Sequence, residues 1–253
     1  MRQGFDHSHQ HAHTTNHRIS SLCLRGMAHE SPEGGCLPPL PRIAVIGAGV
    51  VGLSVAYELI RELGEDNVDV TVIAESFMDQ TTTYGSGGLW EPYQIAGTPE
   101  EDVNKWGKVA FDHFLEIYHS EECGAAGVQI MGFYQLFTAE QEKDYKTPSF
   151  HDIVFNFQHL SARELKKMEL PEQFTKAYSF STIVVEQKYY MSWMMRRLEA
   201  LGVRFIQRHL SSLDEVSGVG YDIVVNCAGL GACELVGDTS MYPIRYCISL
   251  FPY

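Results

Sequence analysis

A short apolar run followed by three regularly spaced glycines is the feature that most constrains the fold of this 253-residue chain. Residues 43–46 are apolar and mostly β-branched, which is typical of a buried parallel strand. Gly47, Gly49 and Gly52 follow at the spacing of a dinucleotide-binding turn. We expect Gly47 to permit the tight turn, Gly49 to let the backbone approach a pyrophosphate, and Gly52 to let helix and strand pack closely.

The residues after this turn extend the same interpretation. The helix that follows would direct its free backbone N–H groups and its positive dipole end toward a pyrophosphate. A second apolar strand covers residues 69–74, and Glu75 stands where an acid would accept hydrogen bonds from ribose hydroxyls. Two simpler interpretations remain open: a glycine-rich turn in another α/β protein, and Glu75 as a solvated loop residue.

Charge and composition exclude some classes of partner and of location. The chain has 32 acidic and 19 basic residues, a formal net charge of −13, which disfavours binding to nucleic acid or to an anionic membrane. No run is long and apolar enough to span a bilayer, and the start of the chain lacks the apolar region of a signal peptide. The 6 cysteines show no metal-type or disulfide-framework spacing, so we expect reduced thiols.

The first 40 residues differ from the rest of the chain. They hold alternating histidines among Gln, Thr, Ser and Asn, and too few apolar residues to offset the entropy of ordering, so we expect a disordered His-rich leader over residues 1–40. Alternating histidines could bind a divalent metal. We prefer a low-complexity leader, or sequence upstream of a true start near Met27, and we expect no metal site.

A Thr- and Gly-rich segment follows the dinucleotide-binding fingerprint, the strand-turn-helix-strand unit of residues 41–74. Residues 77–93 include three consecutive threonines and then Gly85, Gly87 and Gly88, a composition that does not suit a plain strand. Hydroxyl groups and a permissive backbone suit close approach to a phosphate or a flat ring, although an ordinary surface loop has the same composition.

The remaining pattern predicts a discontinuous sheet. We expect a helix over residues 100–118 that carries its apolar side chains on one side, a capping-box helix from Ser161, and a helix over 189–201 with Trp193 and Leu198 inward. We expect strands at 128–137, 152–157, 178–186, 203–207 and 221–229, the last two returning to the first sheet. The apolar positions of the first of these helices are Val103, Trp106, Val109, Ala110, Phe114 and Ile117.

Several of these segments together resemble the D-amino-acid oxidase and D-aspartate oxidase family of FAD enzymes. The resemblance is carried by residues 42–54, by the Thr triplet with Gly88-Leu89-Trp90-Glu91-Pro92-Tyr93, by residues 202–205, and by residues 225–231. It implies an α/β fold in which a Rossmann-like FAD-binding domain (41–100 and 202–232) is interleaved with a mixed α+β substrate domain (101–201 and 233–253) that is incomplete.

The resemblance also implies which residues contact FAD. The pyrophosphate would lie over the first helix, the adenosine ribose at the end of the second strand, and the flavin along the Thr- and Gly-rich segment. Glu91 departs from the glutamine that the family often has at that position. The implied cofactor-binding residues are Ala48, Gly49, Val50, Val51, Gly52, Glu75, Ser76, Thr82, Thr83, Gly88, Leu89, Glu91, Val203, Ala228 and Gly229.

The activity implied by the resemblance is oxidative deamination of D-amino acids to 2-oxo acids, ammonia and hydrogen peroxide, with molecular oxygen as electron acceptor. The family's carboxylate-binding arginine and lid tyrosines have no counterparts, because the chain diverges after Tyr242-Pro243-Ile244-Arg245, so the catalytic residues are unknown and we expect a truncated product. An inactive flavin-binding or interaction fragment is therefore a second hypothesis. A glycine or amine oxidase and a nicotinamide dehydrogenase fit the residues less well.

Substrate, location and assembly stay open at this point. Residues 88–93 favour neutral D-amino acids, whereas residues 228–231 with Gly237-Asp238 favour D-aspartate. The family is cytoplasmic or peroxisomal, but the chain ends without a Ser-Lys-Leu type peroxisomal address. A homodimer would belong to a full-length form.

Overall fold

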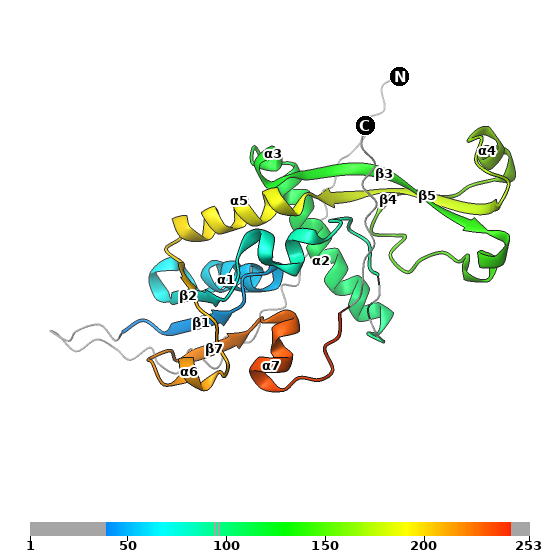
Figure 1. Cartoon of the computed structure of the whole chain (residues 1–253). Helices are drawn as coiled ribbons and strands as arrows, with labels where there is room; N and C mark the ends of the chain where they lie inside the picture. Colours follow the sequence, from blue (N-terminus) through cyan, green and yellow to red (C-terminus); the bar gives the residue numbers. More distant parts are fainter. Residues whose placement is uncertain (1–38, 94, 96, 244–253) are drawn as a thin grey trace, which may run out of the picture. The chain divides into compact units, whose positions relative to one another are not determined.

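The computed structural model describes residues 39–93, 95 and 97–243. The chain divides into residues 1–39 and a compact unit of residues 40–253, and the account below concerns the described part of that second unit (Figure 1). Residues 1–38 of the expected His-rich leader, which include its alternating histidines, and the divergent segment after Arg245 lie outside the described residues.

A four-stranded parallel sheet organises this unit. Its strands are β1 (Arg42–Ile46), β2 (Asp69–Ala74), β6 (Arg204–Gln207) and β7 (Ile223–Asn226), in the spatial order β6-β2-β1-β7. β1 pairs in parallel with β2 on one side and with β7 on the other, and β2 pairs in parallel with β6. This order confirms the prediction that two late strands return to the first sheet.

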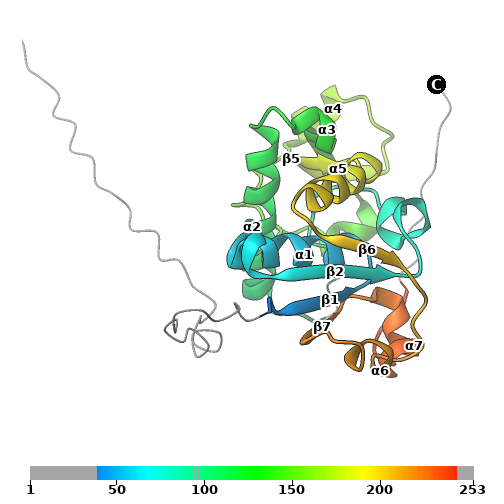
Figure 2. The ribbon, with the colours of Figure 1, turned by 90° about the vertical axis from the view of Figure 1, so that its left-hand side faces the viewer.

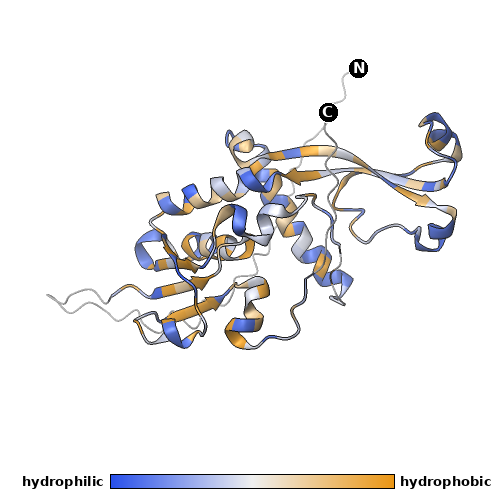
Figure 3. Ribbon diagram, viewed as in Figure 1, coloured by the Kyte–Doolittle hydropathy of each residue, from blue (hydrophilic) through white to orange (hydrophobic). Residues whose placement is uncertain are grey.

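Helices cover both faces of the parallel sheet (Figure 2). Because side chains alternate along each strand, each strand contributes to a core on both faces. Ile43 and Val45 of β1 belong to the larger apolar core, on the side of α1 (Val50–Leu63). Ala44 and Ile46 belong to a second, smaller core. That smaller core includes residues of α6 (Asp214–Ser217) and α7 (Ala232–Val236). Strands buried on both faces read as continuous apolar runs, as the colouring of Figure 3 shows for β1 and β2.

A second, antiparallel sheet follows in the chain. It consists of β3 (Val128–Thr138), β4 (Phe155–His159) and β5 (Phe174–Val185) in the order β3-β5-β4. Its helices are α2 (Glu100–Tyr118), α3 (Cys123–Ala126) and α4 (Ala162–Lys167), and Ser161 and Glu164 form the expected capping box of α4. The strand expected at 152–157 lies instead at 155–159, and Asn156 within it has φ 53°, where the register with β5 shifts between Phe155 and Gln158.

The segment before α2 joins the second sheet to the first core. Leu89 forms an antiparallel bridge with Val184, and the Trp90 amide donates to the Ile183 carbonyl at 2.9 Å. The Thr182 hydroxyl, which is fully buried, donates to the Trp90 carbonyl at 2.9 Å. Trp90 is thereby fixed as a central side chain of the larger core.

The buried side of α2 matches the expected one at Val103 and Ile117 but differs in the middle of the helix. Phe111 is buried, but Trp106 is 60% exposed and Val109 is 67% exposed. The reason is the position of Trp90, whose ring centroid lies 5.0 Å from that of Phe111 and whose ring packs on Gly107. Periodicity placed the apolar residues of α2 on a helix, but long-range packing on Trp90 selects which of them are buried.

Helix α5 (Gln187–Ala200) buries Trp193 and Leu198, as predicted, and packs against both α1 and α3. It therefore contacts the parallel-sheet part as well as the helix that precedes β3. The division into a cofactor domain and a substrate domain stays a prediction. Across the described residues, none of the helices is both long and apolar enough to cross a bilayer.

Candidate functional site

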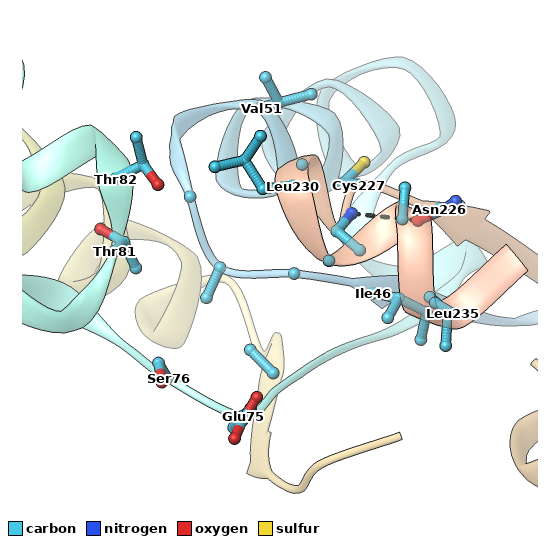
Figure 4. Close-up of a pocket in the computed structure, with 18 of the residues that line it drawn as sticks. Ile46, Val51, Glu75, Ser76, Thr81, Thr82, Asn226, Cys227, Leu230 and Leu235 are labelled. Atoms are coloured by element: carbon cyan, nitrogen blue, oxygen red, sulfur yellow. Dashed lines mark hydrogen bonds between the residues drawn. The ribbon is translucent and has the colours of Figure 1, made fainter. Parts of the chain in front are cut away.

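A pocket of about 610 Å³ lies at the carboxyl ends of the parallel strands. It is bounded by the turns after β1, β2, β6 and β7, by the amino end of α1 and by the Thr-rich segment (Figure 4). Ligands of open parallel sheets bind at this edge, where the loops after successive strands meet. The position of the pocket follows directly from the strand order.

The turn after β1 requires glycine for steric reasons. Gly47 has φ 111°, a conformation that L side chains rarely adopt, and a Cβ there would collide with the Cys227 carbonyl oxygen. The Gly47 amide donates to the Ile73 carbonyl at 2.8 Å, so the turn is anchored to β2. A Cβ at Gly52 would lie 1.9 Å from the Gly47 carbonyl oxygen. These contacts fix the amino end of α1 against the strand that precedes it.

The amino end of α1 is open toward the pocket. Gly49 is the N-cap and supplies no side-chain cap, and the first turn contains no acidic residue. The Val50 amide donates to the Thr83 hydroxyl at 3.1 Å, which links the helix to the Thr-rich segment. Apart from the Val50 amide, the first turn of this 14-residue helix presents free N–H donors and a positive dipole end, and both favour an anion.

The Thr-rich segment forms two short 3-10 turns, η3 (Met78–Gln80) and η4 (Thr82–Gly85). Thr81 and Thr82 line the pocket beside the α1 end, as the view in Figure 4 shows. The Thr81 hydroxyl donates to the Met78 carbonyl at 2.7 Å, so it stabilises the turn. This segment is folded as turns, which agrees with the prediction that it is not a plain strand.

The opposite end of the pocket is formed by Glu75 and Ser76, directly after β2 (Figure 4). The Glu75 carboxylate is exposed, and its backbone carbonyl accepts a hydrogen bond from Gln207 at 3.1 Å. Its side chain is exposed and lines the pocket. His209 Nδ1 lies 3.3 Å from its Oε2.

The structure brings ten of the fifteen expected cofactor-binding residues to this one pocket. They are Ala48, Gly49, Val50, Val51, Glu75, Ser76, Thr82, Thr83, Ala228 and Gly229. Gly52 lies behind the turn, buried against Gly47. The pocket therefore unites residues from the turns after β1, β2 and β7, which are more than 150 positions apart along the chain.

Four expected residues lie elsewhere. Gly88 has φ 68°, and a Cβ there would collide with the Val185 carbonyl oxygen, so it serves the junction with β5 together with Leu89. Glu91 is half-buried next to that junction, and desolvation by burial raises the pKa of its carboxyl group. Val203 is buried at the amino end of β6, whereas the pocket lies at the carboxyl end.

The pocket also contains residues that the sequence interpretation did not name as cofactor-binding. Arg208, His209 and Leu210 follow β6. Asn226 is the last residue of β7, and Cys227 comes directly after it. The rule that parallel strands end at the same edge, applied to the predicted strands 203–207 and 221–229, could have found them. Leu210 lines the pocket, whereas Val203 does not.

The segment after β7 has a defined local geometry. The Asn226 Oδ1 accepts from the Ala228 amide at 3.0 Å, a short turn that is drawn as a dashed line in Figure 4. Burial raises the pKa of the Cys227 thiol, so this cysteine stays protonated and is not a nucleophile at neutral pH. Among the described residues, no group of three or more His, Cys, Asp or Glu is arranged to hold a metal ion.

Comparison with known proteins agrees with this geometry. The chain is 33% identical over 204 residues to human D-aspartate oxidase, covering 81% of this chain and 58% of that protein. It is 33% identical over 204 residues to a D-amino-acid oxidase of Rubrobacter xylanophilus, covering 81% of this chain and 57% of that one. The chain thus spans less than two thirds of these relatives.

Solved structures show the same fold. Glycine oxidase from Geobacillus kaustophilus matches with a TM-score of 0.57 at 18% identity, covering 79% of this chain and 59% of that chain. L-proline dehydrogenase from P. horikoshii matches with a TM-score of 0.54 at 18% identity, covering 79% of this chain and 56% of that chain. A family model described as FAD dependent oxidoreductase matches residues 42–253. The chain therefore belongs to the FAD dependent oxidoreductase (DAO) family.

Proposed function

We propose that this chain binds FAD in the pocket at the carboxyl edge of the parallel sheet. One observation carries the proposal: the uncapped amino end of α1 and the Glu75 carboxylate lie at opposite sides of the same pocket. The first suits a diphosphate and the second a ribose diol, and a dinucleotide carries both groups in that order.

The steric features of the pocket support this assignment. A Cβ at Gly49 would lie only 3.2 Å from the Thr83 hydroxyl oxygen, so a side chain there would crowd the space next to the helix end. Ala48 and Ala228 are small, and Gly229, with φ 56°, adds no side chain. Backbone groups on both sides of the α1 end can therefore approach a diphosphate, with Val51 and Thr82 at its rim.

The proposed activity of the whole protein is oxidative deamination of D-amino acids. When bound, FAD supplies the electron acceptor for oxidation of the amino acid to an imino acid, which hydrolyses to a 2-oxo acid and ammonia, while oxygen is reduced to hydrogen peroxide. The residues of this chain hold the diphosphate and the ribose. Relatives named as D-aspartate oxidase and as D-amino-acid oxidase support the substrate class and leave the choice between D-aspartate and neutral D-amino acids open.

A second candidate is FAD binding without turnover. It is favoured by the state of Arg208, whose Nη2 lies 2.6 Å from Glu215 Oε2. A substrate carboxylate is best anchored by a guanidinium that offers two N–H donors. Arg208 is the one arginine among the described residues that line the pocket, and one of its nitrogens already pairs with Glu215.

The test is the absorbance spectrum of the purified chain, followed by anaerobic addition of D-aspartate and then D-alanine. Bound flavin whose blue band bleaches with either substrate supports the oxidase proposal and names the preferred substrate. Bound flavin without bleaching supports the second candidate. A protein that retains no flavin and takes up none on addition of FAD would contradict both.

A further inference from the structure

The outer strand β3 of the antiparallel sheet has one edge without a strand partner among the described residues. β3 is 11 residues long and pairs with β5 on one side only (Figure 1). None of its residues is charged, and none is proline. Native proteins usually protect a sheet edge with charged residues, proline, bulges or a very short strand, because a free edge can pair with another chain.

The other outer strands carry such protection. β6 and β7 have four residues each, and Arg204 adds a charge to β6. β4 has five residues, and Asn156 within it has φ 53°. In contrast, the register of β3 with β5 is regular from Val128 to Phe137. Among the outer strands of the two described sheets, β3 is therefore the one that best fits a partner strand.

The bonds around β5 show which backbone groups of β3 point outward. The Ile183 carbonyl accepts from the Trp90 amide, on the side of β5 away from β3. The Glu186 amide, directly after β5, donates to the Gly127 carbonyl on the β3 side. Backbone groups of successive residues point to opposite sides of a strand, so even-numbered residues of β5 face odd-numbered residues of β3. The even-numbered residues of β3 therefore direct their N–H and C=O groups outward.

Both ends of this outward row already have partners. The Val128 carbonyl accepts from the Cys123 thiol at 3.1 Å. The Thr138 amide donates to Gln141 Oε1 at 3.1 Å. Between these ends, the outward backbone groups have no hydrogen-bond partner in the described part of the chain at Ile130, Gly132, Tyr134 and Leu136. The free edge thus has a defined length, and Phe133 lies at its centre.

We propose that β3 is a docking edge for a second copy of this chain, paired antiparallel about a two-fold axis at Phe133. Such an interface uses the same edge on both copies and closes as a dimer. In this register Ile130 lies opposite the partner's Leu136, and Gly132 lies opposite the partner's Tyr134. No other antiparallel register joins all four free residues, and each of these pairs exchanges two backbone hydrogen bonds.

The side chains of β3 fit this register on both faces. Tyr134 is 59% exposed, and a Cβ at Gly132 would have no atom within 4 Å. The partner's Tyr134 ring therefore has room to cover Gly132, a pairing in which an aromatic ring shields a strand glycine. On the other face Phe133 meets the partner's Phe133, and Met131, which is exposed, lies opposite the partner's Gln135. Because β3 carries no charge, no like charges of the two strands meet across the axis.

This interface is separate from the FAD pocket, because no residue of β3 lines that pocket. The inference therefore goes beyond the proposed function and does not depend on it. Dimerisation through β3 should be the same with and without FAD.

The first test is sedimentation velocity of the purified chain over a series of concentrations. For the wild type we expect the average mass to rise from that of one chain toward that of two. Y134K places a charge at the centre of the edge and removes the ring that covers Gly132. Because symmetry doubles this loss, the dissociation constant of the dimer should rise by about tenfold or more.

W106K is the matched control. Trp106 is also aromatic and is 60% exposed, against 59% for Tyr134, but it belongs to α2. W106K should dimerise like the wild type. Circular dichroism verifies that each variant is folded.

A second test reads the register directly and decides the case if Y134K is unstable. In the double variant M131C/Q135C the two new thiols lie about 14 Å apart within one strand, too far for a disulfide. In the proposed dimer each lies opposite the other position of the partner, where the Cα atoms of the two strands are about 4.5 Å apart. We expect mild oxidation to link position 131 of one chain to position 135 of another, identified by mass spectrometry of the joined peptides. M131C alone should not link two copies of position 131.

Several results would overturn the inference, and none of them bears on FAD binding. They are a wild-type chain that stays monomeric at every concentration, a dimer that Y134K leaves unchanged, and a dimer that W106K weakens as much as Y134K does. A monomer in which the amides of Ile130, Gly132, Tyr134 and Leu136 exchange slowly with deuterium would also overturn it, because another segment of the same chain would then cover the edge.

Discussion

Replacement of Gly52 by alanine tests the close packing of α1 on β1. The new methyl carbon would lie 1.9 Å from the carbonyl oxygen of Gly47, whereas ordinary contacts begin near 3.4 Å. The obstacle is backbone and not a flexible side chain, so the helix must move by more than 1 Å from the turn. Overpacking of a well-packed site typically costs about 1–3 kcal/mol. We expect the upper end of that range.

The same displacement would move the amino end of α1 away from the pocket. For a unit of this size, about 3 kcal/mol corresponds to a fall of the melting temperature by about 6–12 °C. Because the Val50 amide and the Gly49 cap move with the helix, we also expect FAD to bind at least about tenfold more weakly, the equivalent of about 1.4 kcal/mol.

The assay combines thermal melting by circular dichroism with titration of FAD by fluorescence quenching. G124A is the matched control, because Gly124 lies in α3 with no atom within 4 Å of a new Cβ. Its melting temperature should equal or slightly exceed that of the wild type. If G52A melts within about 1 °C of the wild type and binds FAD equally, the steric account of the fingerprint is refuted.

Three further predictions concern individual contacts. T83V removes the acceptor of the Val50 amide, so it should cost about 1 kcal/mol in thermal melts and weaken FAD binding; unchanged values would contradict this. Burial raises the pKa of Glu91, so its ionisation destabilises the fold as pH rises above about 4. E91Q should therefore raise the melting temperature at pH 8 but not at pH 4, and an equal effect at both pH values would argue against it. F111A should cost about 3–5 kcal/mol in urea denaturation and W106A less than about 0.5 kcal/mol, and similar losses would show that α2 buries Trp106.

Local sterics made the fingerprint turn predictable. The role of Gly52 depends on a contact with Gly47, five residues before it, and Gly47 itself needs the freedom of glycine because its φ is 111°. The atom that a Cβ at Gly47 would meet belongs to Cys227, which the local spacing does not show. The strands were predictable for a similar reason, since an apolar β-branched run suits a sheet covered on both faces. Local patterns sufficed wherever the constraint was itself local.

Long-range packing determines which side chains of a helix are buried, and local sequence patterns do not show it. The residues of α2 have helical spacing, but the choice of Phe111 over Trp106 as the buried one depends on Trp90, which β5 holds in place. Gly88 illustrates the same point, because a Cβ there would collide with the carbonyl oxygen of Val185, which is distant in the sequence. A local sequence pattern predicts neither the contact of Phe111 with Trp90 nor that of Gly88 with Val185.

The difference between Val203 and Leu210 has another physical origin. Both lie beside β6, one before it and one after it. Only the carboxyl end of a parallel strand meets the pocket, so strand direction alone separates Leu210 from Val203. A contact of Val203 with the cofactor stays a prediction.

Hydrogen exchange of the purified chain with and without FAD tests the central claim most directly. The account predicts that FAD slows exchange of the amides in residues 47–53, 75–83 and 226–231, which border the pocket or its turn, while β3 and β4 stay unchanged. Protection confined to the antiparallel sheet, or no protection at saturating FAD, would contradict a cofactor site at the amino end of α1.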